Sequence, residues 1–479
     1  MASFSWQLRR RKPIGLALGK TGEEDTGLQR SLGIVHLTAI GVGATIGTGI
    51  FFVLGEAVPK AGPAVIWSFV VAGIVAGLTA LCYAELASAV PISGSSYSYA
   101  YVTMGELAAM FVAGCLLLEY GVSSAAVAVG WSEYLNQLLG NVIGWQIPAE
   151  LSKAPELGGI VNLPAIVLVL LCMLLLMRGA SESAWVNSIM VLIKLGVLTF
   201  FVLVGFTGWN ADNLAEFAPF GTAGVFAASG VIFFSYIGLD AVSTAGEEVR
   251  DPQRTLPRAL ILALCIVTGF YILVAAAAVG AQPWREFEGQ EAGLAQILQN
   301  IIGAPWPGTL LAAGAVISIF SVTLVTLFGQ TRILFAISRD GLLPKVLSRV
   351  NPRTHVPTWS ILVVAAAVSL LAGFLPLALL AEMTSIGTLS AFTIVAIGVI
   401  LLRRRHPNLE RGFRVPGYPV TPILTILGCL WIIRSLDSLT LIAFVVWTVV
   451  VLAWYLLVAR RTSALNAYSE QELERLDAD

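Results

Sequence analysis

The chain has 479 residues, of which 57% are hydrophobic and only 12% are charged, and its mean hydropathy is +0.84. A soluble globular chain carries about 25% charged residues, so this composition excludes a soluble protein and predicts an all-α polytopic membrane protein. The formal net charge of −1 provides no basic surface for nucleic acid.

Residues that bind metals or nucleotides are not grouped in the sequence. The five cysteines are scattered without the spacing of a metal or redox site, and the three histidines lie far apart. The sequence has no Walker A motif for ATP and no visible pair of catalytic groups. We therefore expect no enzyme activity, no catalytic residue, no metal site and no organic cofactor.

Residues 1–32 are basic and then acidic, and they lack an apolar core of signal-peptide length. We expect a cytosolic arm without a cleaved leader. Twelve apolar segments follow, each close to the length that spans a bilayer as a helix, with Gly- and Pro-rich turns between them. They cover roughly residues 33–56, 63–89, 107–139, 161–178, 184–208, 224–246, 256–281, 305–336, 357–374, 379–402, 419–435 and 438–459.

Lysines and arginines predict the orientation, because cytosolic connections carry an excess of them. The termini and the even-numbered connections hold nearly all of these residues, whereas the odd-numbered connections hold only Lys60, Lys153, Arg285 and Arg434. We expect a multi-pass protein of the cell inner (plasma) membrane with both termini in the cytosol. Lys194 belongs to neither set, because it lies near the centre of the fifth segment.

The first apolar segment contains GVGATIGTGIFF, residues 41–52, with four glycines at mid-span. Glycine is a poor helix former, and non-helical backbone survives in a membrane only where it lines a cavity. An unwound stretch would expose N–H groups that attract a carboxylate and carbonyl groups that attract an ammonium group. An α-amino acid carries both groups. The alternative is close helix packing, which small residues also permit.

The sixth segment has a polar, kink-prone centre at residues 235–238, followed by Asp240, which we expect to hold the unwound stretch. Interrupted segments at matching positions of two halves indicate a transporter with inverted repeats. The first and sixth segments are five apart, so each half has five helices and the second half is inverted. Predicted parts are the arm 1–32, the first repeat 33–222, the second repeat 223–402, helices 11 and 12 at 403–459, and a cytosolic tail 460–479.

Several long motifs occur in order along nearly the whole chain. They are IGVGATIGTGIFFVLGEAVPKAGPA, CYAELASAVPISGSSYSYAY, LEYGVSSAAVAVGWSEYL, FFSYIGLDAVSTAGEEVRDPQRTLPRA and FGQTRILFAISRDGLLP. The chain resembles the bacterial type of the cationic amino acid transporter family, within the amino acid–polyamine–organocation superfamily. The resemblance implies a leucine-transporter-like fold of five plus five helices, two added C-terminal helices, and a central amino acid site.

The resemblance also implies roles for individual residues of the two breaks. The substrate carboxylate would meet the main chain and hydroxyl around Gly47, Thr48 and Gly49, and its amino group would meet carbonyls of Thr45, Phe234 and Ile237. Phe234 would also act as a gate. Thr45 stands where the family favours isoleucine, so the pocket is more polar than usual only if this side chain faces it.

Lys194 is too deep in its segment for easy snorkelling, so it must face the protein interior. Burial disfavours the charged form of a lysine, which suits a group that gains and loses a proton. The resemblance implies that its ammonium replaces the sodium ion of related transporters and couples transport to protons. Expected partners are the carbonyl of Gly43 and the hydroxyl of Ser318 or Ser321, and the alternative is a permanently charged structural lysine.

Other polar residues inside the segments suggest roles in selectivity and gating. Glu119 either lines the pocket, adding negative potential or holding a water beside the substrate amino group, or bonds to a neighbouring helix. Val325 and Thr326 are the expected selectivity positions. Glu85, at the cytosolic end of the second segment, is either a gate or anchor residue or a solvated charge.

The sequence thus predicts a secondary active transporter for proton-coupled uptake of L-amino acids, either small and neutral ones such as alanine or cationic ones. Two alternatives stay open: an exchanger or facilitator of cationic amino acids without proton coupling, and an amino acid receptor or sensor. Expected partners are the amino acid and the lipid bilayer, and no nucleic acid. A small single-helix accessory protein stays open as a partner, and we expect a monomer.

Overall fold

The computed structural model describes residues 10–17, 33–47, 49–90, 95–179, 184–244, 249–352, 354 and 356–478. These residues form helices joined by turns, and no β-strand occurs among them. The prediction of an all-α chain is therefore confirmed for the described part.

Most helices are long and follow the predicted apolar segments. In the first half they are α3 (Ile34–Thr45), α4 (Val53–Ala61), α5 (Val65–Ala89), α6 (Ser95–Thr103), α7 (Glu106–Leu116), α8 (Ser123–Ile143), α10 (Leu163–Met177) and α11 (Ala184–Thr207). In the second half they are α12 (Gly221–Phe233), α13 (Ala241–Thr244), α14 (Pro252–Ala281), α15 (Gly293–Ile302), α16 (Trp306–Arg339), α17 (Thr358–Phe374), α18 (Leu377–Arg405), α19 (Val420–Arg434) and α20 (Ser438–Trp454).

Short helical turns connect or extend these helices. They comprise the α-helical turns α2 (Ile14–Ala17), α9 (Ala149–Ser152), α21 (Arg460–Thr462) and α22 (Glu470–Ala478), the 3₁₀ turns η1 (Gly62–Ala64), η3 (Pro155–Leu157), η4 (Ala211–Leu214), η5 (Phe234–Tyr236), η7 (Trp284–Phe287), η8 (Lys345–Ser348) and η10 (Ala464–Ala467), and the π-helical turns η2 (Leu117–Val122) and η9 (Tyr455–Ala459).

Seven helical stretches among the described residues are long and apolar enough to cross a membrane. They are Val53–Ala89, Glu106–Ile143, Ser188–Thr207, Gln253–Ala281, Trp306–Arg339, Leu377–Arg405 and Ser438–Ala467. Shorter apolar helices, such as α10, α17 and α19, occupy the other predicted segments. The chain is therefore an integral membrane protein, and the count of twelve crossings stays a prediction.

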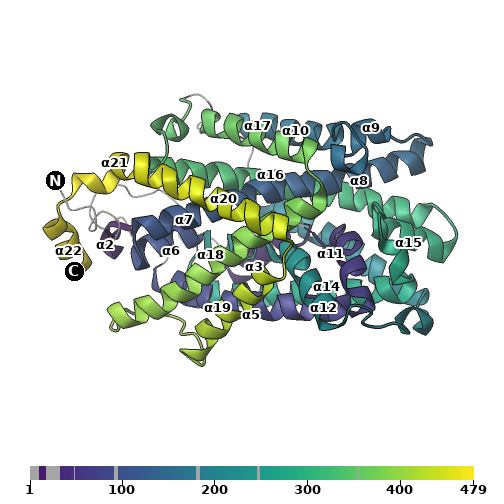
Figure 1. Ribbon diagram of the computed structural model, residues 1–479, viewed down its shortest axis with the longest axis horizontal. Coiled ribbons are helices and arrows are strands. Elements are labelled where there is room, and N and C mark those ends of the chain that lie inside the picture. Colours follow the sequence, from purple (N-terminus) through teal and green to yellow (C-terminus); the bar gives the residue numbers. More distant parts are fainter. Residues whose placement is uncertain are drawn as a thin grey trace.

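The helices form two packed groups with α18 between them (Figure 1). In the first group, α14 packs on α3 and α5, and α12 packs on α4 and α5. In the second group, α8 packs on α16 and α10 packs on α17. α18 contacts members of both groups, and α11 contacts α3 and α14 on one side and α16 on the other.

The two ends of the helix array are easily distinguished in Figure 1. α2 packs against α22 at one end, which we call the near end. α9 and α15 lie at the opposite end, which we call the far end. Both described termini therefore lie on the same side of the molecule, as the predicted even number of crossings requires.

The outer faces of several helices are apolar and exposed. On α20, Leu439, Ile442 and Val445 are 62%, 63% and 59% exposed. Side chains of this kind are expected where a helix faces lipid rather than water. The buried apolar cluster lies inside and includes the residues around the interruptions of α3–α4 and α12–α13.

Candidate functional site

The first interruption separates α3 from α4. α3 ends at Thr45, Ile46 is extended with φ −72° and ψ 116°, and α4 begins only at Val53. The described residues between these helices form turns. The predicted break within the first apolar segment is therefore confirmed.

Gly47 needs its missing side chain for two reasons. Its φ of +114° lies in a region that residues with a Cβ rarely adopt. An added Cβ would also lie 2.9 Å from Cγ2 of Val322 in α16, and 3.8 Å from Nζ of Lys194 in α11. The main chain at Gly47 therefore passes close to both neighbouring helices, while Thr48, a predicted ligand, lies outside the described residues.

Two other glycines of the motif allow close packing against the sixth segment. A Cβ on Gly49 would overlap Oγ of Ser235 and lie 3.0 Å from Cδ1 of Phe234. A Cβ on Gly41, inside α3, would lie 2.6 Å from Cγ2 of Val242. The unwinding and the close packing that the sequence left as alternatives both occur, and at Gly47 they occur together.

The second interruption follows η5. Ile237 is extended with φ −65° and ψ 146°, Gly238 has φ +92°, and α13 begins at Ala241. An added Cβ on Gly238 would lie 2.8 Å from the carbonyl oxygen of Ala44. The two interrupted segments therefore touch through their main chains.

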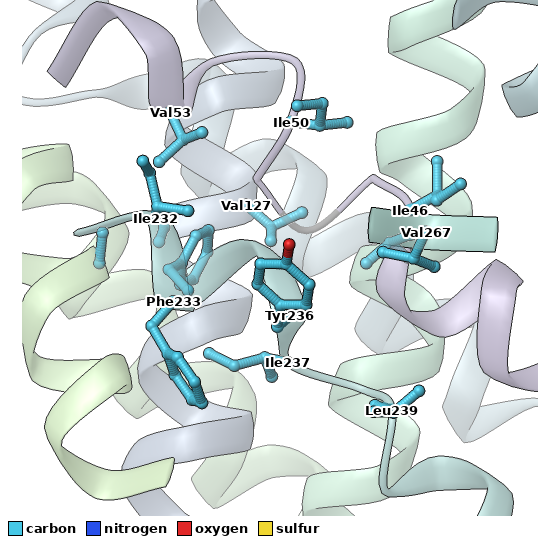
Figure 2. Packing of buried hydrophobic residues seen from close by; sticks show 14 of the residues in the cluster. Ile46, Ile50, Val53, Val127, Ile232, Phe233, Tyr236, Ile237, Leu239 and Val267 are labelled. Atoms are coloured by element: carbon cyan, nitrogen blue, oxygen red, sulfur yellow. The ribbon is translucent and has the colours of Figure 1, made fainter. Parts of the chain in front are cut away.

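Figure 2 shows this region, with Ile46 and Ile50 along the first interruption and Ile237 and Leu239 along the second. Their side chains belong to one buried apolar cluster. The polar main chain of both interruptions is thus enclosed by apolar side chains, where an unpaired polar group is costly. Such backbone has to be satisfied by side chains, by water or by a ligand.

Tyr271 of α14 links the two interruptions. Its hydroxyl lies 2.9 Å from the carbonyl oxygen of Thr45 and 2.8 Å from that of Ser235, and it can donate to either. The tyrosine is completely buried. Sequence reasoning missed this residue, although a hydroxyl in the middle of an apolar segment signals a buried partner.

The side chain of Thr45 does not make the site more polar. Its hydroxyl donates to the carbonyl of Gly41, one turn earlier in α3, at 2.7 Å. This local bond occupies the hydroxyl proton. The carbonyl oxygen of Thr45, which the resemblance assigned to the substrate, lies within hydrogen-bonding distance of the Tyr271 hydroxyl.

Lys194 is 1% exposed in α11, and its ammonium donates to the carbonyl of Gly43 at 2.7 Å. The structure contains the contact expected from the sequence. Of the two expected serine partners, Ser318 has a buried hydroxyl without a hydrogen bond among the described residues, so it is not the partner. Ser321 is also buried in α16.

Phe234 and Ile237 lie at the start of the second interruption. Phe234 is fully buried, and its ring centroid is 6.0 Å from that of Phe52. The ring of Phe234 also lies close to Gly49. An aromatic ring in this place covers the first interruption. The carbonyl of Phe234 accepts the N–H of Ile237 at 3.3 Å and has a lone pair left for another donor.

A second polar group lies beside the second interruption. Oδ2 of Asp240 accepts from the hydroxyl of Ser95 at 2.9 Å and from that of Tyr120 at 3.0 Å. Asp240 is 2% exposed. Its carboxylate thus anchors the chain after Gly238 to α6 and to η2, as the sequence led us to expect.

Glu119 lies in η2, where a π-helical turn interrupts the long helix from α7 to α8. π-Turns of this kind are frequent at functional sites. Glu119 is fully buried, and neither carboxylate oxygen has a hydrogen bond. Its polar neighbours include Asp240 and Thr388. Thr388 belongs to the neighbouring α18 and lies beside this carboxyl group, so the alternative of a carboxyl group bonded to an adjacent helix stays open.

The two predicted selectivity positions differ in their surroundings. Thr326 is 5% exposed, donates to the carbonyl of Val322 at 3.0 Å, and accepts from Ser124 of α8 at 2.8 Å. Val325 is half-buried on the same helix. The structure therefore brings Thr326 into the interior network of hydrogen bonds.

These contacts define what the site can bind. The start of α4 presents N–H groups and a positive dipole end, whereas the end of α3 and the residues after η5 present carbonyl oxygens. A zwitterion with a carboxylate beside an ammonium group matches both. The buried amine of Lys194 lies beside these groups, because it donates to the carbonyl of Gly43 and is close to the main chain at Gly47.

Comparison with known proteins gives one consistent family. Residues 32–467 match the amino acid permease family model. The chain is 42% identical to the branched-chain amino acid permease BcaP of Bacillus subtilis (strain 168), over 95% of this chain and 98% of that protein. It is 41% identical to the methylthioribose transporter of the same organism, over 96% and 99% of the two chains.

A eukaryotic relative extends the similarity. The vacuolar cationic amino acid transporter 2 of Arabidopsis thaliana is 38% identical over 84% of this chain and 64% of its own length. The expected resemblance is therefore confirmed, and the family consists of transporters rather than enzymes. The chain belongs to the amino acid permease family of the amino acid–polyamine–organocation superfamily, as a bacterial relative of the cationic amino acid transporters.

Proposed function

We propose that the protein imports neutral L-amino acids together with protons, by alternating access across the bacterial inner membrane. In this proposal the near end is cytosolic, and twelve helices form two inverted five-helix repeats followed by α19 and α20. The proton is the coupling ion, and no other cofactor is needed.

The two interruptions support binding of the amino and carboxylate groups common to all α-amino acids. The carboxylate would lie at Gly47, Thr48 and Gly49, at the start of α4. The ammonium group would lie at the carbonyls of Thr45 and Phe234, with Ile237 next to them. Because main-chain groups do the binding, the site is insensitive to side-chain changes at most of these positions.

The observation that carries proton coupling is the bond from Lys194 to Gly43. The ammonium reaches α3 just before its interruption, from a helix that also packs on α16. A protonated lysine bridges these helices, whereas a neutral lysine loses much of the attraction to the carbonyl. Loss of the proton would thus loosen α3 at the substrate site and allow release.

Among the relatives, the branched-chain permease, which matches over 98% of its own length, supports a neutral substrate, whereas the cationic amino acid transporters support the alternative of a cationic one. The name of one close relative specifies branched-chain amino acids, and that of another specifies methylthioribose. The alternative of cationic substrates is favoured by the two buried carboxyl groups of Glu119 and Asp240. Competition by alanine, valine, leucine, arginine, lysine and methylthioribose against labelled alanine distinguishes these classes.

Uptake into proteoliposomes with an inward proton gradient tests the coupling. We expect accumulation of labelled alanine in the wild type and none in Lys194→Ala, while exchange at equal pH persists. Lys345→Ala, at an exposed lysine in η8, is the matched control and should accumulate substrate normally. Unchanged proton-driven accumulation by Lys194→Ala would refute the mechanism, and binding without any flux would indicate a receptor.

A further inference from the structure

α18 carries one ion pair near each of its ends, in which the carboxylate is buried and the basic side chain is partly exposed. Near its start, Oε1 of Glu382 lies 2.6 Å from Nζ of Lys60, the penultimate residue of α4. Near its end, Arg403 donates through Nε and Nη2 to the two carboxylate oxygens of Glu85, in the last two turns of α5. η1, just after Lys60, packs on η7, which leads to α15 at the far end. Arg405, two residues after Arg403, donates to the carbonyl of Thr103 in α6, which packs on α2 at the near end.

The far pair, Lys60–Glu382, is held in place by a second helix. Glu382 is 2% exposed, and its other oxygen accepts from the main chain of Asp437 at 3.2 Å and from the hydroxyl of Thr440 at 2.9 Å. Lys60 also lies 3.5 Å from the carboxylate of Asp437. The pair therefore joins α4 to both α18 and the start of α20.

The near pair, Glu85–Arg403, is likewise part of a larger contact. Glu85 is completely buried and also accepts from the N–H of Val415 at 2.7 Å. Arg411 approaches the same carboxylate at 3.4 Å, and the guanidinium of Arg403 lies over the ring of Tyr418. The pair therefore joins α5 to α18 and to the connection that follows it.

Both ion pairs connect the first group of helices to α18. α4 and α5 are consecutive, separated only by η1, and both pack on α12. The first interruption precedes α4 and the second follows α12 and η5. Both interruptions therefore belong to the first group of helices. Any tilt of the group that opens the site towards one end must separate α4 or α5 from α18 at that end.

We propose that Lys60–Glu382 and Glu85–Arg403 are opposing locks, which close the site to the far and the near side respectively. Both are formed in this structure, which therefore describes a state closed at both ends. Release of one lock favours opening towards its own side. The inference rests on the alternating access of the proposed function, but on neither proton coupling nor the substrate class.

The test measures opening directly rather than transport. Single reporter cysteines at Ala57 in α4 and Ala84 in α5, both buried, are introduced into the full chain with its own cysteines replaced. Labelling by a membrane-impermeant maleimide in detergent gives a rate for each side. We expect Glu382→Gln to raise labelling at position 57 about tenfold without raising it at position 84, and Glu85→Gln to do the reverse.

Two further variants separate a lock from a general loosening. Glu216→Gln removes an ion pair with Arg285 that is exposed, with 67% and 56% exposure of the two side chains, and should change neither rate. Lys60→Gln, which breaks the same pair from the other helix, should raise labelling at position 57 as Glu382→Gln does. Equal acceleration at both reporters, or no change in either glutamine variant, would overturn the proposal, whereas a wrong substrate class would leave every labelling rate as expected.

Discussion

Gly238 lies so close to Ala44 that an added Cβ would be 2.8 Å from the Ala44 carbonyl oxygen. Gly238 also has φ +92°, so a side chain costs about 1–3 kcal/mol in backbone strain alone. We expect Gly238→Ala to weaken alanine binding at least about tenfold, because it pushes the two interruptions apart. Isothermal titration calorimetry of the purified protein measures this change.

The control for this substitution is Gly269→Ala in α14. No atom lies within 4 Å of the added Cβ, and the residue lies inside a regular helix. Alanine should stabilise the helix by about 1 kcal/mol and leave binding unchanged. Equal binding by both variants would show that the contact between the interruptions is not needed for the site.

Substitutions at Gly47 test separately the two reasons for a glycine in this motif, which are its positive φ and its close packing on α16. Gly47→Ala brings a Cβ 2.9 Å from Cγ2 of Val322 and also strains the φ of +114°. The double variant with Val322→Ala removes the steric contact but not the strain. We expect both variants to lose alanine binding, and recovery in the double variant would assign the glycine to packing alone.

Tyr271→Phe removes only the hydroxyl between the carbonyls of Thr45 and Ser235. The ring keeps its edge contacts with Phe69 and Tyr236, so the variant should fold. A lost hydrogen bond is worth about 0.5–1.5 kcal/mol, and we expect alanine affinity to fall up to about tenfold. Tyr236→Phe, whose hydroxyl bonds to Phe69 at 3.1 Å, is the control and should bind normally.

The positions of both interruptions were predictable from local composition, and the burial of Lys194 was predictable from the cost of a charge at that depth. Its contact with Gly43 was expected from the resemblance to the family. The partners of Lys60, Glu85 and Tyr271 were not, since each lies on a helix far away in sequence. Glu85 illustrates the difficulty. Its place near the end of its helix was correctly inferred, but Arg403 reaches it only through the packing of α5 on α18.

Ser318, one of the two serines expected to bond to Lys194, could not be excluded from the sequence for a related reason. Its helix and its depth suited a partner of Lys194, but the direction of a side chain around a helix depends on packing that a single sequence does not reveal. The hydroxyl of Ser318 is buried and has no hydrogen bond in the part of the chain that the structure describes. Depth alone therefore identified the region of α16 but could not choose between Ser318 and Ser321.

The buried ion pair between Arg10 and Glu106 is expected to stabilise the fold at a place remote from the substrate site. Arg10 donates through Nε at 2.8 Å and Nη2 at 2.9 Å to Glu106, and both side chains are fully buried. Arg10→Ala leaves the carboxylate without its cation, which costs about 3–5 kcal/mol. We expect the melting temperature in detergent to fall by several degrees.

The control is Lys12→Ala, which breaks a partly exposed pair with Asp340 at 3.2 Å. Pairs of this kind contribute about 0–1 kcal/mol, so melting should be nearly unchanged. Similar melting of the two variants would mean that the buried pair adds no more than an exposed one. Since Arg10 also donates to Asn466, we further expect Arg10→Ala to make the C-terminal tail more sensitive to protease.

Glu119→Gln tests which part of the substrate the buried carboxyl group serves. If Glu119 acts beside the amino group, directly or through a water, the variant loses an interaction that every amino acid makes. A hydrogen bond to a charged group contributes about 1.5–3 kcal/mol, so we expect alanine and arginine to bind at least about tenfold more weakly, by the same factor. Competition against labelled alanine gives both affinities, and Glu156→Gln at an exposed loop position should change neither. A loss confined to arginine would contradict the role at the amino group and place Glu119 at the substrate side chain instead.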